Sequence, residues 1–200
     1  MNIREYGVFF WTIIGVSALF VASPALSRLL VYPRTEFFTE FWLLDSNRRA
    51  EDYPFNVTVG EEYKVFLGIG NRLGYAAYYE VAVKFRNQTQ SGADSFNRTW
   101  SSLPVLYEIR AFVADESVWE TPLTFSLDYE YNETLSQVDV HSMVLNDIPL
   151  EIPACTAVWD TERSGFFGNL FFELWIHKGT PGAFTYHERF VGLWLNMTGS

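Results

Sequence analysis

Hydrophobic and polar residues alternate along most of the chain beyond residue 33. In residues 77–85, for example, Tyr79, Val81 and Val83 alternate with more polar positions. This period of two is typical of β-strands that bury one face. Gly, Pro, Asn and Asp gather between the alternating stretches, where they favour turns. The pattern therefore predicts a mostly β fold.

The predicted strands are short and closely spaced, and each is bounded by turn residues. They cover residues 35–45, 62–70, 77–85, 105–113, 123–129, 138–152 (a hairpin turning at Asn146-Asp147), 169–178 and 184–198, and the last two are joined by a turn with Pro181 and Gly182. About seven to nine strands at this spacing predict a single antiparallel, immunoglobulin-like β-sandwich.

The stretch "VFLGIGNRLG" (residues 65–74) contains three glycines and resembles a phosphate-binding loop at first sight. A dinucleotide fingerprint, however, has the spacing G-x-G-x-x-G, follows a strand and opens a helix. Here Gly68, Gly70 and Gly74 are spaced one residue too far apart, and a second strand follows. The stretch predicts a hairpin without a nucleotide. We expect a bulky aromatic or another backbone beside Gly68, and a positive φ at Gly74.

Near the N-terminus, residues 6–27 contain no charged side chain. As a helix they would be about 33 Å long, which is enough to cross a bilayer. We expect a cytoplasmic N-terminus (residues 1–5), a transmembrane signal anchor that contacts the lipid bilayer (residues 6–32) and an extracytoplasmic β-sandwich domain (residues 33–200). A cleaved signal peptide is the alternative interpretation.

Five Asn-x-Thr triplets, the acceptor signal for N-glycosylation, follow this segment. Chance predicts roughly one such triplet in a chain with ten asparagines. Glycosylation takes place outside the cytoplasm, so the triplets predict a cell-membrane protein with a cytoplasmic N-terminus and an extracellular C-terminal domain. The candidate acceptors are Asn56, Asn87, Asn97, Asn132 and Asn196.

The net charge of -10 and the pI of about 4.7 argue against nucleic acid as a partner, because no basic stripe is present to neutralise phosphates. The same charge disfavours electrostatic docking on anionic lipid headgroups. The one cysteine, Cys155, excludes an intrachain disulfide and is expected to be a small buried hydrophobe. The sequence leaves open whether the chain binds a protein partner or forms a homo-oligomer.

Candidate chemical groups lack the spacing of known sites. The histidines and acidic residues show neither zinc-type nor calcium-loop spacing, and Ser164 lacks the G-x-S-x-G elbow. We therefore expect no catalytic residue, no metal and no cofactor, and we expect that the protein is not an enzyme. The residues considered are His177 and His187 with Glu173 or Glu188 for a metal; Asp45, Glu51, Asp52 and Asp94 for calcium; and Glu61 with Glu62 or Asp128 with Glu130 for a glycosidase pair.

Six tryptophans lie beyond the apolar segment. Exposed tryptophans stack on sugar rings, whereas buried ones fill a core. For Trp175 and Trp194 a core position is favoured, since apolar residues occupy both faces of their strands. A second apolar face also fits contact with a partner or with another subunit.

Four motifs together resemble a known family: "FFTEFWLLD", "EDYPFNVTVGEEYKVFLGIGN", "SVWETPLTF" and the closing "NLFFELWIHK…FTYHERFVGLWLNMT". They are similar to the archaeal membrane-protein family called domain of unknown function 1616, over residues 35–90 and 116–198. The resemblance implies a membrane-anchored β-sandwich of the adhesion and interaction kind, with no catalytic residues to transfer. Many members carry several membrane spans before this domain, whereas one is expected here.

The sequence thus favours a membrane-anchored, N-glycosylated β-sandwich acting as a non-catalytic interaction or envelope-structural module. One alternative is an accessory subunit of a larger membrane complex, with the span packing through small residues such as Gly15, Ala18 and Ala22. Another is a carbohydrate-binding or carbohydrate-processing surface protein that uses exposed tryptophans and carboxylates.

Overall fold

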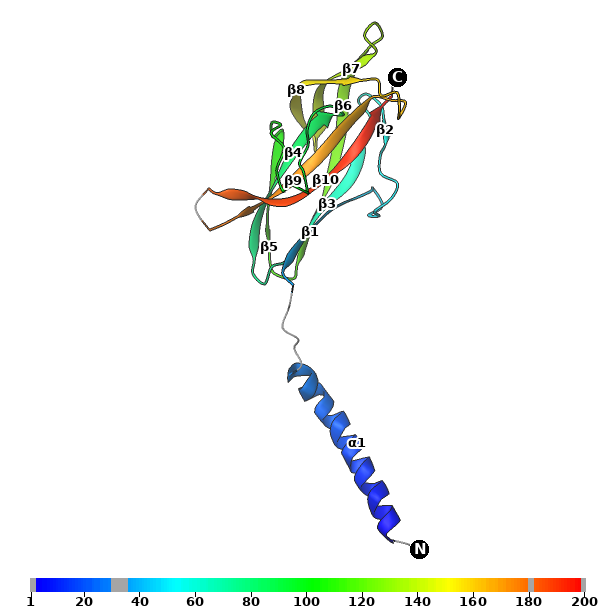
Figure 1. Ribbon diagram of the computed structural model, residues 1–200, viewed down its shortest axis with the longest axis vertical. Helices are drawn as coiled ribbons and strands as arrows, with labels where there is room; N and C mark the ends of the chain where they lie inside the picture. Colours follow the sequence, from blue (N-terminus) through cyan, green and yellow to red (C-terminus); the bar gives the residue numbers. More distant parts are fainter. Residues whose placement is uncertain (1–2, 30–35, 180–181, 199–200) are drawn as a thin grey trace. The chain divides into compact units, whose positions relative to one another are not determined.

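The computed structural model describes residues 3–29, 36–179 and 182–198. The chain divides into two compact units, Met1–Phe37 and Phe38–Ser200. The first contains one helix and the second is built from strands (Figure 1). The mostly β fold and the apolar N-terminal helix are therefore confirmed.

Helix α1 (Ile3–Leu29) is apolar around its whole circumference. Its stretch Tyr6–Pro24 is long and apolar enough to cross a membrane, and none of it is buried. Residues 30–32 of the predicted span, and Pro181 of the predicted turn, lie outside the described residues.

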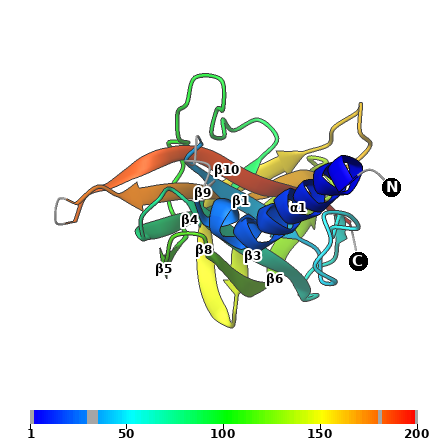
Figure 2. The same cartoon turned by 90° about the horizontal axis from the view of Figure 1, so that it is seen from below.

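The described part of the second unit forms ten strands in two sheets. The strands are β1 (Phe38–Leu44), β2 (Asn56–Val57), β3 (Tyr63–Arg72), β4 (Ala77–Asn87), β5 (Tyr107–Val113), β6 (Val118–Asn132), β7 (Gln137–Leu145), β8 (Ile148–Val158), β9 (Phe167–His177) and β10 (Phe184–Met197). Sheet A has the order β1-β3-β6-β7-β8, and sheet B has the order β2-β10-β9-β4-β5 (Figures 1 and 2). All neighbouring strands are antiparallel except β2 and β10, which pair in parallel.

One hydrophobic core lies between the two sheets. On β4, the side chains of Tyr79, Val81 and Val83 are fully buried, and on β9 those of Leu170 and Phe172 are as well. Burial of each such side chain contributes roughly 1.5–3 kcal/mol before the entropy of folding is subtracted. On β3, β4 and β10 the inner face is the one that the alternation predicts, with Val65, Val81 and Leu193 among its buried side chains.

The parallel pairing of β2 with β10 differs from the antiparallel sandwich that the alternation predicts. Asn56 pairs with Asn196 and Val57 with Met197. A strand of two residues is too short for a periodic signal, so sequence patterning does not reveal it. Residues 130–165, whose role the sequence leaves open, mainly form β7 and β8 and extend sheet A.

The glycine stretch lies in β3 and in the turn that follows it. Gly68 faces outward on sheet A, and a methyl group at this position would overlap the indole ring of Trp42 on β1. Gly74 has a φ of 82°, a left-handed conformation that glycine adopts without strain. The expectations for both glycines are confirmed, and the stretch is a hairpin.

We expect Gly68→Ala to lower the free energy of unfolding by about 1–3 kcal/mol, because the half-buried Trp42 ring must move to admit a methyl group. Gly70→Ala is the matched control on the same strand. There the methyl group meets the carboxylate end of Glu40, whose side chain is 41% exposed and is able to swing away. Urea unfolding of the two variants measures the difference, and equal losses would contradict the role assigned to Trp42.

Candidate functional site: the loop-covered face of sheet B

The β4–β5 loop (residues 88–106) lies over the outer face of sheet B (Figure 2). A buried ion pair holds it there: Lys84 Nζ is 2.9 Å from Glu173 Oε2, and the two side chains are 3% and 0% exposed. Both also bind the backbone of Ser101. Lys84 donates to the Ser101 carbonyl (2.7 Å), and the Ser101 N–H donates to Glu173 Oε1 (2.7 Å). The two charges therefore fasten the loop to β4 and β9.

Sequence reasoning missed this ion pair, because each partner looks like an ordinary outward-facing strand residue. The available signal was that β9 is apolar on both faces around Glu173, so that a charge there is covered and not solvated. The carboxylate weighed as a metal ligand beside His177 is instead the partner of Lys84. The contact of Lys84 with Glu173 Oε2 is an ion pair without hydrogen-bond alignment.

Three aromatic side chains pack together where the loop meets sheet B: Trp100 of the loop, Trp175 of β9 and Tyr186 of β10. The ring centroid of Trp175 lies 5.6 Å from that of Trp100 and 5.6 Å from that of Tyr186. The ring centroids of Trp100 and Tyr186 are 6.2 Å apart. Trp175 Nε1 and Tyr186 Oη are buried and have no hydrogen-bond partner among the described residues. Burial, with a further contribution from the carboxylate of Glu173, raises the pKa of Tyr186 to about 12, so its phenol stays protonated at neutral pH.

The expectation that Trp175 and Trp194 fill the core is wrong. Both are half-buried on the outer face of sheet B. The guanidinium groups of Arg86 and Arg163 lie 4.8 Å and 5.7 Å from the centroid of the Trp194 ring. Their strands are apolar on both faces because one face meets the core and the other meets the loop and the stacked arginines.

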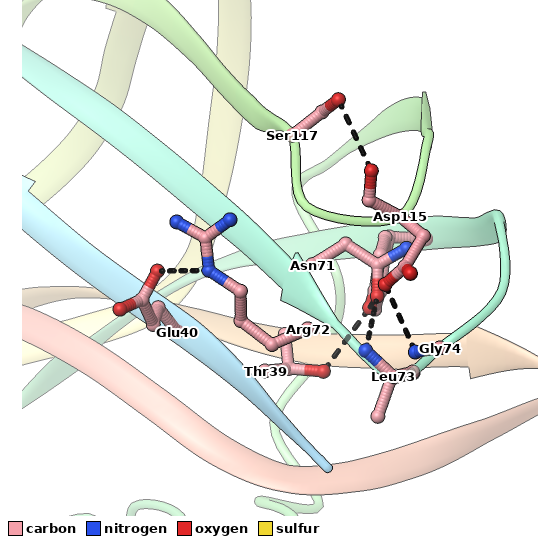
Figure 3. A network of polar contacts seen from close by, with 9 residues as sticks. Thr39, Glu40, Asn71, Arg72, Leu73, Gly74, Asp115 and Ser117 are labelled. Carbon is pink, nitrogen blue, oxygen red and sulfur yellow. Dashed lines mark hydrogen bonds and ion pairs between the residues drawn. The ribbon is translucent and has the colours of Figure 1, made fainter. Parts of the chain in front are cut away.

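A second buried feature, a polar network, joins the two sheets at the end where the chain enters β1 (Figure 3). Thr39, Asn71 and Tyr79 are each at most 1% exposed. Asn71 Nδ2 donates to the carbonyls of Tyr75 (2.8 Å) and Val113 (2.9 Å), so Asn71 Oδ1 accepts from the Tyr79 hydroxyl (3.2 Å). The Tyr79 oxygen then accepts from Thr39 (3.0 Å).

The same network holds the turn after β3. Leu73 N donates to Asn71 Oδ1 (3.1 Å), and Gly74 N donates to Asp115 Oδ1 (2.9 Å), as Figure 3 shows. Beside it, Arg72 Nε lies 3.7 Å from Glu40 Oε2. One buried amide thus organises the strand ends and the turn around it.

The order of donors in this network determines the tautomer of His187. Thr39 uses its hydrogen toward Tyr79, so it accepts from His187 Nε2, which lies 2.8 Å away. His187 therefore carries a proton on Nε2. Burial lowers the pKa of His187, and the charge of Arg189 lowers it further.

We expect the titration of His187 to weaken the fold as pH falls from about 7 to 5. Because the pKa of His187 is lower in the folded than in the unfolded chain, the unfolded chain binds more protons in this window. His187→Gln keeps an N–H donor for Thr39 but does not titrate, so its stability should depend less on pH. Urea unfolding across this range tests the prediction, and identical pH profiles for the two proteins would contradict it.

Two of the five candidate glycosylation asparagines are built into the fold. Asn87 is 8% exposed, and its Nδ2 donates to the carbonyl of Thr156 (2.7 Å). Asn196 Nδ2 donates to Asn56 Oδ1 (2.9 Å), while Asn196 Oδ1 accepts from Phe166 N (3.2 Å). These amides hold strands together, which makes Asn87 and Asn196 the least suited acceptors in the folded domain.

The other three candidate acceptors reach solvent. Asn56 and Asn97 are exposed and Asn132 is half-buried. Asn97 lies in a turn closed by Asp94 and Thr99, and Asn132 ends β6 at the connection to β7. Glycosylation at these sites stays a prediction.

The remaining candidate groups are not brought together. In the part of the chain that the structure describes, no group of three or more His, Cys, Asp or Glu side chains is placed to hold a metal ion. His187 points into the sandwich, whereas His177 packs against Tyr78 on the outer face of sheet B. Cys155 is buried as expected, and burial raises the pKa of its thiol to about 12.

Two of the carboxylates considered for calcium serve turns. Asp45 Oδ1 accepts from the backbone N–H groups of Asn47 (2.9 Å) and Arg49 (2.7 Å). The bond from Arg49 is the largest cause that lowers the pKa of Asp45. The pKa of Asp94 is lowered in the same way, above all by the backbone N–H of Asn97.

A cavity of about 710 Å³ runs along β7 and β8. Its lining includes the carboxylates of Asp139 and Glu151 beside His141. Asp139 already accepts hydrogen bonds from Thr156 and Gln137. The lining, taken from the described residues, includes no tryptophan, so it does not supply the sugar-binding surface that the carbohydrate hypothesis requires.

Solved structures similar to this chain include three crystal structures of beta-glucosidase from Listeria innocua, in complex with isofagomine, glucose and gluconolactone. Their identities are 11%, 12% and 10%, and their TM-scores are 0.39, 0.33 and 0.32. The matches cover 84%, 80% and 80% of this chain but only 17%, 16% and 16% of the glucosidase. At such TM-scores the likeness carries no argument about function. No curated protein matches the chain.

A family model described as Domain of unknown function (DUF1616) matches residues 33–138. The matched range includes the β4–β5 loop, which the sequence motifs left out. It ends at the start of β7, so the closing strands that also carry the resemblance lie beyond it. The match covers more than half of the 200 residues. The chain therefore belongs to the DUF1616 family.

Proposed function

We propose that the protein is a membrane-anchored, N-glycosylated β-sandwich that acts outside the cytoplasm as a non-catalytic interaction or envelope-structural module. Helix α1 carries this proposal: between Tyr6 and Pro24 nearly every side chain is exposed, and most are apolar. Such a surface is unfavourable in water, whereas a bilayer accommodates it. The five Asn-x-Thr triplets support an extracellular position for the sandwich.

Fractionation of cells that produce the full chain tests the anchor. We expect the protein to stay in the membrane pellet through an alkaline carbonate wash and to be released by detergent. Protease added to intact cells should digest the β-sandwich and spare the span. Recovery in the alkaline supernatant would overturn the anchor, and protection of the sandwich in intact cells would overturn its extracellular position.

The glycan part of the proposal has a separate measurement. The intact mass of the purified full chain should exceed that of the bare polypeptide by the mass of one or more glycans. A mass equal to that of the polypeptide would remove glycosylation from the proposal and leave the anchor untouched.

An accessory subunit of a larger membrane complex is the second candidate. Gly15, Ala18 and Ala22 fall along one side of α1, and an added Cβ at Gly15 would meet no atom within 4 Å. Small residues of this kind let another helix approach closely in a membrane. Co-purification with foreign subunits in fixed stoichiometry would favour this candidate, whereas a monomeric or self-assembled protein in detergent would favour the first.

A further inference from the structure

The β4–β5 loop carries a short, hydrogen-bonded turn from Asp94 to Thr99. The two residues pair through their backbones, with N-to-O distances of 2.9 Å and 3.0 Å. Asp94 Oδ1 also accepts from the backbone N–H groups of Phe96 (2.8 Å) and Asn97 (3.2 Å), and Arg98 has a φ of 57°. Backbone and carboxylate bonds therefore define the turn without help from the side chain of Phe96.

Phe96 lies in this turn with 91% of its surface exposed. Contact with water is unfavourable for so large an apolar side chain, and a turn held in one shape gives it no route into the core. The ring therefore offers an exposed apolar face that a group attached beside it is able to cover.

The next residue in the chain can carry such a cover. Asn97 is exposed and begins the triplet Asn97-Arg98-Thr99. Its Nδ2 donates to Asp94 Oδ2 (2.6 Å). A primary amide has two N–H hydrogens. A sugar replaces one of them and leaves one hydrogen able to donate to Asp94, and the other bonds of the turn come from backbone groups that the modification does not touch.

We propose that Asn97 is the principal N-glycosylation acceptor of this protein and that the first pyranose of its glycan packs its C–H face on the ring of Phe96. This inference rests on the glycosylated module proposed above and names the site and the contact. The sugar donor is a lipid-carrier phosphate sugar. Asn97 Nδ2 bonds to the anomeric carbon, the bond from that carbon to the carrier phosphate oxygen breaks with its electron pair leaving on the phosphate, and one amide proton passes to a base of the transferase.

The other triplets lack this combination. Asn56 and Asn132 also follow aromatic residues, but those rings already pack on protein: the ring centroid of Phe55 lies 6.0 Å from that of Phe167, and Tyr131 lies 5.4 Å from Phe166. The amides of Asn87 and Asn196 hold strands together, and the hydroxyls of their Thr89 and Thr198 are bonded within the fold. Only the Asn97 triplet joins an exposed amide to an aromatic ring that is almost wholly exposed, among the described residues.

Site-resolved mass spectrometry of the full chain, purified in detergent from the membranes of cells that produce it, tests the acceptor. We expect the highest glycan occupancy at Asn97, and Asn97→Gln should remove the mass of one glycan. Occupancy at Asn132 or Asn56 with a bare Asn97 would overturn the inference while leaving the glycosylated module intact. Bare asparagines at all five triplets would overturn both.

Thermal unfolding of the same preparations tests the contact with Phe96. We expect the glycosylated wild type to unfold about 2–4 °C above Asn97→Gln. In a Phe96→Ala background this difference should vanish, and the turn should survive because its bonds do not involve the ring. Leu135→Ala is the matched control, since Leu135 is an exposed apolar residue (62%) in the turn after Asn132. The contact would be overturned if the glycan at Asn97 raised the unfolding temperature as much in the Phe96→Ala background as in the wild type. It would also be overturned if Leu135→Ala reduced the effect of the glycan as much as Phe96→Ala does.

Discussion

Lys84→Met will lower the free energy of unfolding by about 3–5 kcal/mol, because it leaves the carboxylate of Glu173 buried without its cation. Methionine fills a similar volume, so little of the loss will come from packing. The Ser101 carbonyl also loses its donor. We therefore expect the β4–β5 loop to become a preferred site of limited proteolysis, while urea unfolding measures the global loss.

Two further variants separate burial from charge. Arg110→Met removes a cation from the same sheet, but the Arg110 side chain is 51% exposed and solvent screens its ion pairs with Glu80 and Glu108, so the expected loss of stability is small. The double variant Lys84→Met/Glu173→Leu removes both buried charges. Its loss of stability should be smaller than the sum of the losses in Lys84→Met and in Glu173→Leu. Similar small losses for Lys84→Met and Arg110→Met would show that the buried pair has no special weight.

Asn71→Leu will lower the free energy of unfolding by about 2–4 kcal/mol: about 1–3 kcal/mol because the buried Val113 carbonyl loses the amide, and about 1 kcal/mol for the lost bond from the Tyr79 hydroxyl, which keeps Thr39. The Tyr75 carbonyl and the Leu73 N–H lose the same partner but lie nearer to solvent. Urea unfolding measures the loss, and hydrogen exchange at Leu73 and Gly74 should rise because the turn after β3 loses its central bond.

Tyr79→Phe is the control for this network. It removes one hydroxyl, yet Thr39 keeps His187 and Asn71 Oδ1 keeps the Leu73 N–H. Each neighbour retains a partner, so the expected loss is about 1 kcal/mol. A loss in Asn71→Leu no larger than that in Tyr79→Phe would show that the amide does not organise this end of the sandwich.

The candidate site was only partly predictable from sequence. The Asn-x-Thr triplets are local and were found directly, and the burial of Cys155 follows from its apolar neighbours. Asn97 is exposed, whereas Asn87 is bound into the fold. The amide of Asn87 donates to a residue 69 positions further along the chain, on another strand. Sequence patterning holds no information about such a contact.

The sequence by itself determined the strand pattern, the hairpin at Gly68 and Gly74, and the apolar helix. The reason is that period-two burial, turn conformation and helix apolarity depend on residues close together in the chain. Only the tertiary structure decided which second faces are covered. Glu173 and Trp175 look like core or surface residues until the β4–β5 loop is seen to lie over them. Covering a sheet from outside requires a segment from elsewhere in the chain, and the two apolar faces of β9 indicate only that both are covered, not which segment covers the outer one.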